Sequence, residues 1–200
     1  MKHRIFIAIN LPKDIKNKLE ECQNKTENLF ASYQNEDSGT GPIRWTKKEN
    51  LHITLLFLGY LSNEEFLEVL GIIKKAAQGI KPFSINLNKI CYGPPNQNKP
   101  PRMIWARGEK NEEMGKLKKG LENSLLSCRD DANETRPYLP HITLGRIKMW
   151  EWRRIEPEER PIVDTDVSLN FEVNSIELME SQLKKGGPQY YVLESFPLLR

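Results

Sequence analysis

The sequence predicts an α+β fold made of two similar halves. Strand patterns and helix patterns follow one another along the whole chain, which is typical of this class. The residues His-Ile-Thr-Leu occur at 52–55 and again at 141–144, in opposite halves of the 200-residue chain. In each half a strand and a helix precede this repeat. We therefore expect a bilobal fold with two lobes related by a pseudo-two-fold axis, each with an antiparallel sheet and helices, around a central cleft.

The spacing of apolar side chains predicts the elements of the first half. We expect strands at residues 4–9, 43–45 and 51–57, a polar loop at 33–42, and helices over 13–30 and 62–79. Pro12 suits the start of the first helix, and Ser62 with Glu65 has the spacing of a capping box at the start of the second. The run LHITLLF at 51–57 is almost wholly apolar, which indicates a strand covered on both faces.

The second half is richer in strand patterns. We expect strands at residues 82–93, 103–107, 141–147, 170–180 and 190–198, a proline-rich loop at 94–101, a helix over 111–126 and a turn around 184–188. Residues 148–166 are highly charged, and we interpret them as an insertion or a short irregular helix. The whole chain, 1–200, is interpreted as one domain of two intertwined lobes.

Composition limits the class of protein and its compartment. Apolar residues make up 38% and charged residues 28%, which is typical of a soluble globular protein, and no apolar run suits a membrane span. The short apolar stretch IFIAI has no cleavage site after it, so we expect no secretory signal. The odd count of three cysteines favours a reducing cytoplasm over a disulfide framework. The net charge of +3 is compatible with an anionic substrate.

Both copies of the repeat place a histidine and a threonine on one face of a strand. Residues i and i+2 of a strand point the same way, about 6.5–7 Å apart, so His52 shares a face with Thr54, and His141 shares one with Thr143. Near neutral pH one imidazole can take a proton while the other gives one to a leaving oxygen. Threonine hydroxyls can donate hydrogen bonds to phosphate oxygens. The set therefore suits cleavage of a phosphodiester without a metal.

A single His-x-Thr strand indicates little, because threonine favours strands and most histidines are ordinary polar residues. Two of the three histidines in one repeated word indicate a shared site. Arg146, directly after the second copy, is either a phosphate ligand or a solvated arginine. No HExxH or CxxC spacing supplies a metal site and no GxxxxGK[ST] motif supplies an ATP site, so we expect no metal and no cofactor.

At these residues the chain resembles the 2H phosphoesterase superfamily, which is named for two H-x-T/S-x motifs. Within it the chain is most similar to the RNA 2′,3′-cyclic phosphodiesterase family, also known as the 2′-5′ RNA ligase family. The resemblance covers nearly the whole chain and is carried by RIFIAINLP (4–12), IRWTKKENLHITLLFLG (43–59), PPRMIWARG (100–108), PYLPHITLGRI (137–147) and SIELMESQLKKGGPQYYVLESFPL (175–198).

The resemblance implies a cytoplasmic enzyme that hydrolyses a terminal 2′,3′-cyclic phosphate of RNA, or of a cyclic nucleotide, to a 2′-phosphomonoester. By match to the first motif His52 is the general acid that protonates the 3′-oxygen, and by match to the second His141 is the general base that activates water. Thr54 and Thr143 hold the phosphate. Neither a membrane nor a protein partner is implied, and we expect a monomer.

Some features depart from the family pattern or leave alternatives open. Leu56 stands where the family often has Lys or Arg, which suggests that one cation near the substrate is absent. The stretches 33–42 and 148–166 are longer than usual. The reverse reaction, 2′-5′ RNA ligation, and an RNA- or nucleotide-binding module without catalysis stay open as functions. Five aromatic side chains are candidates to stack on a base: Phe6, Trp45, Phe57, Trp105 and Tyr190.

Overall fold

The computed structural model describes residues 3–34, 41–95, 99–125, 138–184 and 187–199. Its first half contains β1 (His3–Asn10), α1 (Lys13–Asn28), β2 (Ile43–Trp45), β3 (His52–Leu61) and α2 (Asn63–Gln78). The elements predicted for this half are confirmed. The capping box at the start of α2 is also confirmed, because the Ser62 hydroxyl accepts from the Glu65 N–H and the Glu65 carboxylate accepts from the Ser62 N–H. The predicted loop lies largely outside the described residues.

The second half supplies most of the strands. It contains β4 (Phe83–Gly93), β5 (Met103–Gly108), α3 (Glu112–Ser124), β6 (His141–Ile147), α4 (Met149–Trp152), β7 (Asp164–Val173), β8 (Ser175–Lys184) and β9 (Gly187–Pro197). The prediction of one strand over 170–180 is wrong, because Asn174 separates two strands there. The beginning of the charged stretch 148–166 forms the short helix α4, as one of the two interpretations predicts, and its end belongs to β7.

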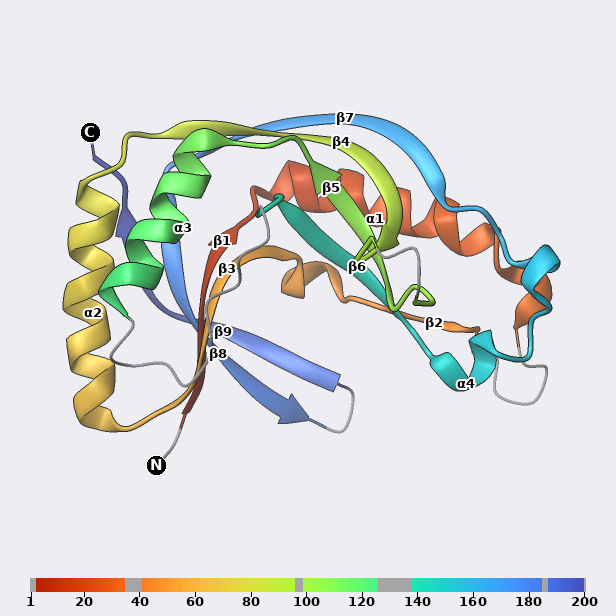
Figure 1. Ribbon diagram of the computed structural model, residues 1–200, viewed down its shortest axis with the longest axis horizontal. Helices are drawn as coiled ribbons and strands as arrows, with labels where there is room; N and C mark the ends of the chain where they lie inside the picture. Colours follow the sequence, from red (N-terminus) through yellow and green to blue (C-terminus); the bar gives the residue numbers. More distant parts are fainter. Residues whose placement is uncertain (1–2, 35–40, 96–98, 126–137, 185–186, 200) are drawn as a thin grey trace.

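All strands of the described residues belong to one antiparallel sheet. The order is β7-β4-β5-β6-β3-β1-β8-β9, with the short β2 paired to β6. β3 and β6 meet through one residue pair, Ile53 with Ile142. On either side of this pair the two halves repeat one another: β3-β1-β8-β9 matches β6-β5-β4-β7. The expected pseudo-two-fold axis therefore passes between the two isoleucines. The β8–β9 hairpin extends beyond the body of the sheet (Figure 1).

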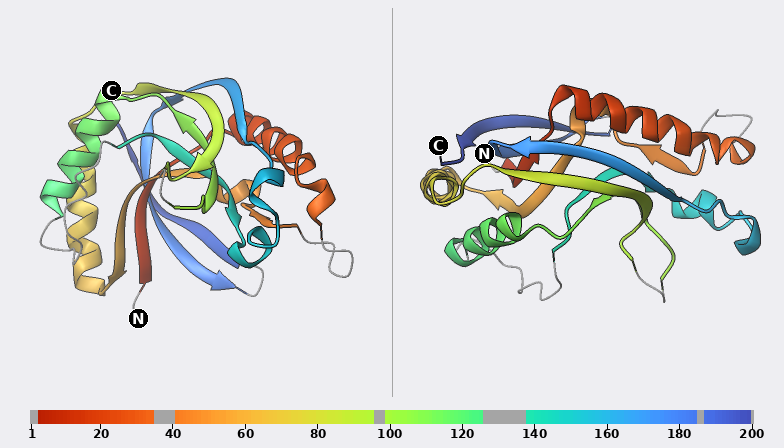
Figure 2. Two further views of the ribbon diagram at one scale, coloured as in Figure 1. Left: turned by 45° about the vertical axis from the view of Figure 1, so that its right-hand side comes forward. Right: turned by 90° about the horizontal axis from the view of Figure 1, so that it is seen from above.

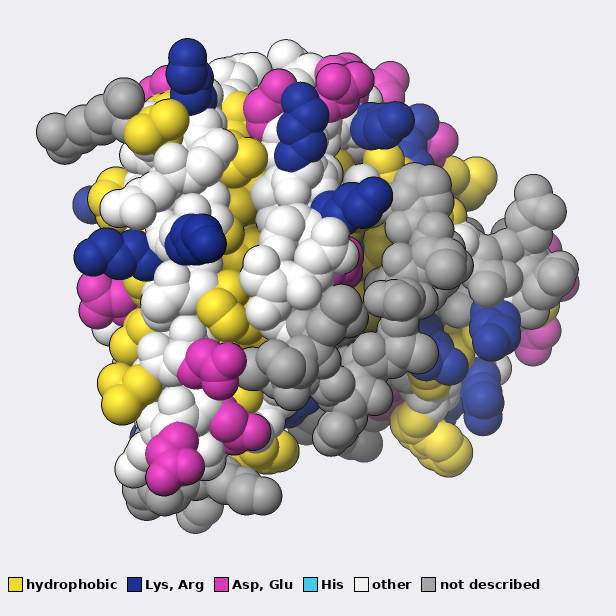
Figure 3. All heavy atoms as spheres, turned by 60° about the vertical axis from the view of Figure 1, so that its left-hand side comes forward, with side chains coloured by type: hydrophobic (Ala, Val, Ile, Leu, Met, Phe, Trp, Pro, Cys, Tyr) yellow, Lys and Arg dark blue, Asp and Glu magenta, His cyan; other side chains and the backbone are white. Residues whose placement is uncertain are grey.

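The helices cover one face of this sheet. α1 contacts β6 and α3 contacts β3, so each half sends a helix onto the repeat-bearing strand of the other half. Viewed from above, α1 lies toward one end of the sheet and α2 with α3 toward the other (Figure 2). A space-filling view onto α2 and α3 shows charged and hydrophobic side chains interspersed, and no described histidine is visible there (Figure 3). The main hydrophobic core lies between the helices and the sheet, and it includes both central isoleucines at 0% exposure.

Candidate active site

The two His-Thr pairs lie on the sheet face opposite the helices, where β3 meets β6. Because the central isoleucines point into the core, the residues on either side of them point away from it. Ile53 pairs with Ile142, and in this antiparallel register His52 lies across from Thr143 and Thr54 lies across from His141. All four side chains are half-buried. We call this the open face of the sheet, and the two histidines occupy diagonal corners of its centre.

The predicted two-sided burial of residues 51–57 is therefore wrong. His52 and Thr54 are half-buried and Phe57 is exposed, whereas their neighbours on the core side are buried. The apolar character of the run concealed the alternation, because leucines stand at successive positions. Leu56 is one of these, and it is 4% exposed. The position where the family often has Lys or Arg thus faces the core in this chain.

Both imidazoles are held by the same kind of backbone contact. Nδ1 of His52 lies 2.7 Å from the carbonyl oxygen of Asn50, and Nδ1 of His141 lies 3.0 Å from that of Leu139. A carbonyl oxygen only accepts, so each Nδ1 carries the hydrogen and each Nε2 is left to exchange protons. Nε2 of His52 lies 3.0 Å from the hydroxyl oxygen of Thr54. In the neutral imidazole that hydroxyl donates to Nε2.

Aromatic rings and cations surround His52. The rings of Phe6 and Tyr190 lie 5.1 and 5.0 Å from its imidazole, the second one edge-on. Burial lowers the pKa of His52 to about 4, with smaller contributions in the same direction from Lys16, His141 and Arg146. The contact with the Asn50 carbonyl opposes this shift. In the free protein His52 is therefore neutral at pH 7.

His141 is held differently, although its strand is the counterpart of β3. Its imidazole stacks on the ring of Trp105, with centroids 4.0 Å apart and planes inclined by 26°. Gly93 lies against the indole, because a Cβ built there would fall 2.2 Å from Cδ2 of Trp105. The indole is thus packed against both the Gly93 backbone and the imidazole. The pseudo-symmetric strands therefore give their histidines unlike surroundings.

Tyr138 connects the two motifs. It stands three residues before His141 of the second motif, and its hydroxyl donates to the backbone carbonyl of Thr54 in the first. Its ring lies 6.2 Å from the imidazole of His141, and the Lys118 ammonium of α3 sits 5.0 Å from the ring centroid. Burial raises the pKa of the Tyr138 hydroxyl, so it remains a donor through the physiological range.

Arg146 also belongs to the open face. The pairing of β5 with β6 shifts by one residue between Ile104 and Trp105, which turns Arg146 to the side that carries Thr143. Nη1 of Arg146 and the hydroxyl of Thr143 each lie 3.8 Å from the sulfur of Met103, and Nε1 of Trp105 lies 3.5 Å from it. Three donors thus converge on a thioether, which is a weak acceptor.

All five residues predicted from the sequence, His52, Thr54, His141, Thr143 and Arg146, therefore lie on one face. Sequence reasoning missed Asn50 and Tyr138, although both stand within three residues of a motif histidine. It treated Trp105 and Tyr190 as base-stacking candidates, whereas each packs on a histidine. Their partners lie far away in sequence, so no local pattern indicated these contacts.

Further side-chain chemistry is sparse in the described part of the chain. No group of three or more His, Cys, Asp or Glu residues is placed there to hold a metal ion. Cys22 and Cys91 are free and half-buried, and Cys128 lies outside the described residues. Among the helices that the structure describes, none is long and apolar enough to cross a membrane.

Comparison with known sequences gives consistent matches. The profile of the LigT-like phosphoesterase family matches residues 9–105. An RNA 2′,3′-cyclic phosphodiesterase of Methanocaldococcus jannaschii is 30% identical over 194 residues, covering 96% of this chain and 99% of that protein. One from Thermotoga maritima is 28% identical over 193 residues, covering 95% of this chain and 92% of that protein.

Comparison with solved structures supports the same fold. A protein of Thermus thermophilus superimposes with a TM-score of 0.77 at 29% identity, covering 98% of this chain and 97% of that one. Escherichia coli LigT complexed with 3′-AMP has a TM-score of 0.73 at 21% identity, with 100% of both chains covered. At that identity the second likeness shows the fold alone.

Proposed function

The chain belongs to the LigT-like phosphoesterase family, and on that premise we propose that it hydrolyses terminal 2′,3′-cyclic phosphates of RNA to 2′-phosphomonoesters. The observation that carries this proposal is the placement of the two His-Thr pairs around the β3–β6 junction. It offers two Nε2 atoms and two hydroxyls to a single phosphorus. The relatives from Methanocaldococcus jannaschii and Thermotoga maritima are RNA 2′,3′-cyclic phosphodiesterases, which supports RNA as the substrate.

The proposed reaction uses His141 as the base and His52 as the acid. Nε2 of His141 takes a proton from water, whose oxygen attacks phosphorus and forms the new P–O bond. The bond between phosphorus and the 3′-oxygen breaks on the opposite side, and Nε2 of His52 gives its proton to that oxygen. The product carries a 2′-phosphate and a 3′-hydroxyl. Proton exchange with solvent then restores both imidazoles.

The acid role requires His52 to be protonated when substrate is bound. Burial and, to a smaller extent, Lys16, His141 and Arg146 disfavour that proton in the free protein. A phosphodiester anion placed among these groups opposes their effect and raises the pKa of His52. The substrate therefore helps to charge its own acid, and Thr54 can turn from a donor to Nε2 into an acceptor or a phosphate ligand.

Thr143 and Arg146 are the proposed phosphate ligands on the second half. Their donors lie near the sulfur of Met103, together with the indole N–H of Trp105. A phosphate oxygen is a much stronger acceptor than a thioether, and a guanidinium binds it with a charge-assisted hydrogen bond. We therefore infer that the Thr143 hydroxyl and the Arg146 guanidinium turn from Met103 to the substrate.

The test is turnover of a short RNA ending in a 2′,3′-cyclic phosphate, in EDTA, followed by phosphorus NMR. We expect a 2′-phosphomonoester, and we expect His52→Ala and His141→Ala each to lower kcat by at least ~10²-fold. His3→Ala, which changes the third histidine of the chain, is the control. A 3′-phosphomonoester would reverse the proposed orientation of the substrate. Normal turnover by either folded histidine variant would rule out the acid–base pair.

A further inference from the structure

We propose that the RNA upstream of the cyclic phosphate runs along the open face of β3, where its bases stack on Phe57 and Tyr60. Arg4, on the neighbouring strand β1, supplies a cation for the RNA backbone. This inference rests on the proposed function and extends it, because it adds a binding site for single-stranded RNA beyond the reacting phosphate.

Two register shifts in β3 place these rings on the open face. Strict alternation after Thr54 would turn residue 57 toward the core. The pairing of β3 with β1 shifts by one residue between Thr54 and Leu56, and again between Phe57 and Gly59. Each shift is a β-bulge, which re-aims the side chains after it. As a result Thr54, Phe57 and Tyr60, at a spacing of three, face the same side.

Both rings are accessible. Phe57 is 58% exposed and Tyr60 is 62% exposed, whereas the core-facing Leu55 and Leu56 are buried. Exposed aromatic side chains on a sheet face are a known platform for RNA bases, since each base offers a flat π surface for stacking. The two exposed rings and the site thus form a track along one strand.

The pseudo-two-fold relation supports a role for Phe57 at the site. A register shift after each HITL repeat places one further side chain on the open face: Phe57 in the first half and Arg146 in the second. Arg146 is the cation proposed to hold the phosphate. Its counterpart is an exposed ring that lies at the same position relative to the other motif, where it can receive the nucleoside part of the substrate.

The rings continue from the catalytic centre without a gap. The ring of Phe57 lies 6.0 Å from that of Phe6, which in turn lies 5.1 Å from the imidazole of His52. Phe6 is 2% exposed and cannot receive a base itself. It instead supports Phe57 next to the histidine, so a base on Phe57 lies beside the reacting phosphate.

The other aromatic side chains near the histidines are already occupied. The indole of Trp105 is packed between Gly93 and the imidazole of His141. Tyr190 meets the Phe6 ring edge-on at 5.2 Å, and it packs edge-on against the other imidazole as well. Among the described rings that adjoin the two imidazoles or Phe6, Phe57 is the exposed one, whereas Trp105, Tyr138 and Tyr190 are half-buried.

Arg4 lies where a backbone phosphate would pass. It is exposed, and it stands across from Tyr60 in the pairing of β1 with β3. Since Phe6 pairs with Phe57, Arg4 and Phe6 share the open face. One guanidinium beside two exposed rings matches single-stranded nucleic acid, which combines a charged backbone with stacking bases.

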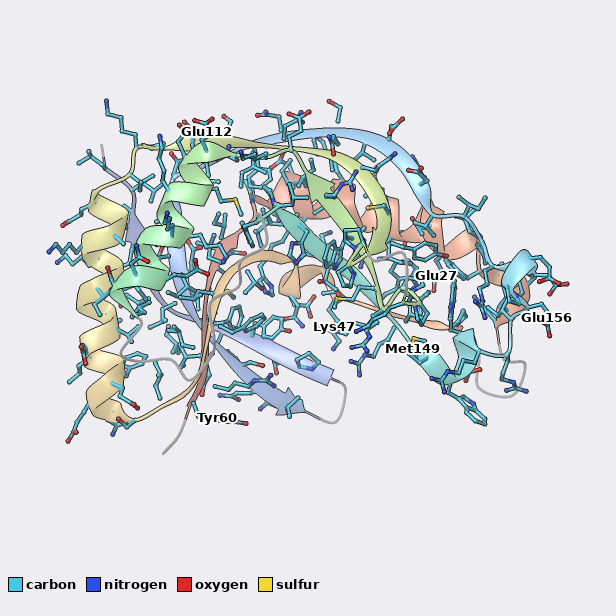
Figure 4. All side chains as sticks on the ribbon, viewed as in Figure 1. Glu27, Lys47, Tyr60, Glu112, Met149 and Glu156 are labelled. Atoms are coloured by element: carbon cyan, nitrogen blue, oxygen red, sulfur yellow. The ribbon has the colours of Figure 1, made fainter. Side chains whose placement is uncertain are left out.

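The test compares two trinucleotides that both end in a nucleoside 2′,3′-cyclic phosphate. One carries three bases, and in the other the two upstream residues are abasic. We expect Tyr60→Ala, which removes the ring for an upstream base, to lower kcat/KM for the first by about 10-fold and to change the second much less. Phe57→Ala removes the ring for the terminal base, which both substrates carry, and should lower kcat/KM for both by a similar factor. Trp150→Ala is the matched control: this side chain is 75% exposed and lies in α4. Its neighbour Met149 is well separated from Tyr60 in the view of Figure 4.

A second readout does not depend on turnover. Equilibrium binding of a fluorescent trinucleotide ending in a 2′-phosphate should weaken by a similar factor in both ring variants. Arg4→Gln should reduce the slope of log Kd against log salt concentration by the amount expected for the loss of about one phosphate contact. Equal effects of Tyr60→Ala on the two substrates, an unchanged kcat/KM in Phe57→Ala, or a loss confined to Trp150→Ala would overturn the proposed track. Failure of the wild-type protein to turn over either substrate would instead count against the proposed function, and binding would still decide the track.

Discussion

The backbone carbonyl oxygen of Asn50 lies 2.7 Å from Nδ1 of His52, and the side chain of the same asparagine holds the start of β9. Its Nδ2 donates to the carbonyl of Pro188 at 2.8 Å, and its Oδ1 accepts from the N–H of Tyr190 at 3.4 Å. Tyr190 then lies edge-on to the imidazole. One buried residue therefore orients the proposed acid and attaches the hairpin that covers it.

Replacing this asparagine should misplace His52 without removing any group that touches the substrate. We expect Asn50→Ala to lower kcat by about 10- to 100-fold, because a small displacement of a catalytic group is enough for such a loss. We also expect the pKa of His52 to rise toward its ordinary value, since a released hairpin admits water. Kinetics and an NMR titration of the imidazole measure the two effects. Gln189→Ala, an exposed change in the same hairpin, is the control. A folded variant with unchanged kcat and unchanged pKa would contradict this role.

An anion at the site should raise the pKa of His52. The pKa of about 4 for His52 in the free protein reflects burial and, to a smaller extent, the cations Lys16 and Arg146 and the neighbouring His141. A tetrahedral anion placed between these cations and the imidazole favours the protonated form. Sulfate is a suitable probe, because it does not titrate between pH 4 and 8. We expect sulfate to bind more tightly as the pH falls toward 4, and to move the NMR titration of His52 upward. An identical titration with and without saturating sulfate would argue against a phosphate position beside this residue.

The same lowered pKa predicts how stability depends on pH. In the unfolded chain His52 takes up a proton near pH 6.5, whereas in the folded protein it does so only near pH 4. The unfolded state therefore binds more protons between these values, and the free energy of unfolding falls as the pH drops from 6.5 to 4. The shift of about 2.5 units corresponds to about 3 kcal/mol. The free energy of unfolding can be measured with urea at several pH values for the wild type and for His52→Gln. As the pH falls from 6.5 to 4, it should drop more steeply in the wild type than in the variant. An equal drop in both proteins would mean that His52 titrates normally.

The sequence was sufficient for the elements that rest on local patterns. The capping box of α2, the repeated HITL strands and the five residues of the proposed site could all be read from residue type and spacing. The bulges of β3 and β6 could not, because a run such as LHITLLFLG gives no sign of where alternation breaks. Those bulges decide that Phe57 and Arg146 face the site and that Leu56 does not.

Contacts between distant segments were also beyond the sequence. Asn50 meets β9 across 138 residues, and Tyr138 meets Thr54 across 84. The two motifs are alike in sequence, yet one histidine is covered by the hairpin and the other stacks on an indole. Such differences arise from contacts with residues far away in the sequence, which the repeat itself does not encode.

The stack of His141 on Trp105 gives a prediction about the proposed base. The centroids lie 4.0 Å apart, and Gly93 packs against the indole, so the ring is a fixed wall for the imidazole. We expect Trp105→Leu to lower kcat by about 10-fold or more, because the imidazole loses the surface that sets its orientation toward water. Trp105→Phe keeps a flat ring on β5 and should retain most of the rate. Trp45→Phe, a change of the same kind on β2, is the control for loss of an indole. Equal rates for Trp105→Leu and Trp105→Phe, both folded, would show that the stack does not orient the base, and the Nδ1 contact with the Leu139 carbonyl would then be sufficient.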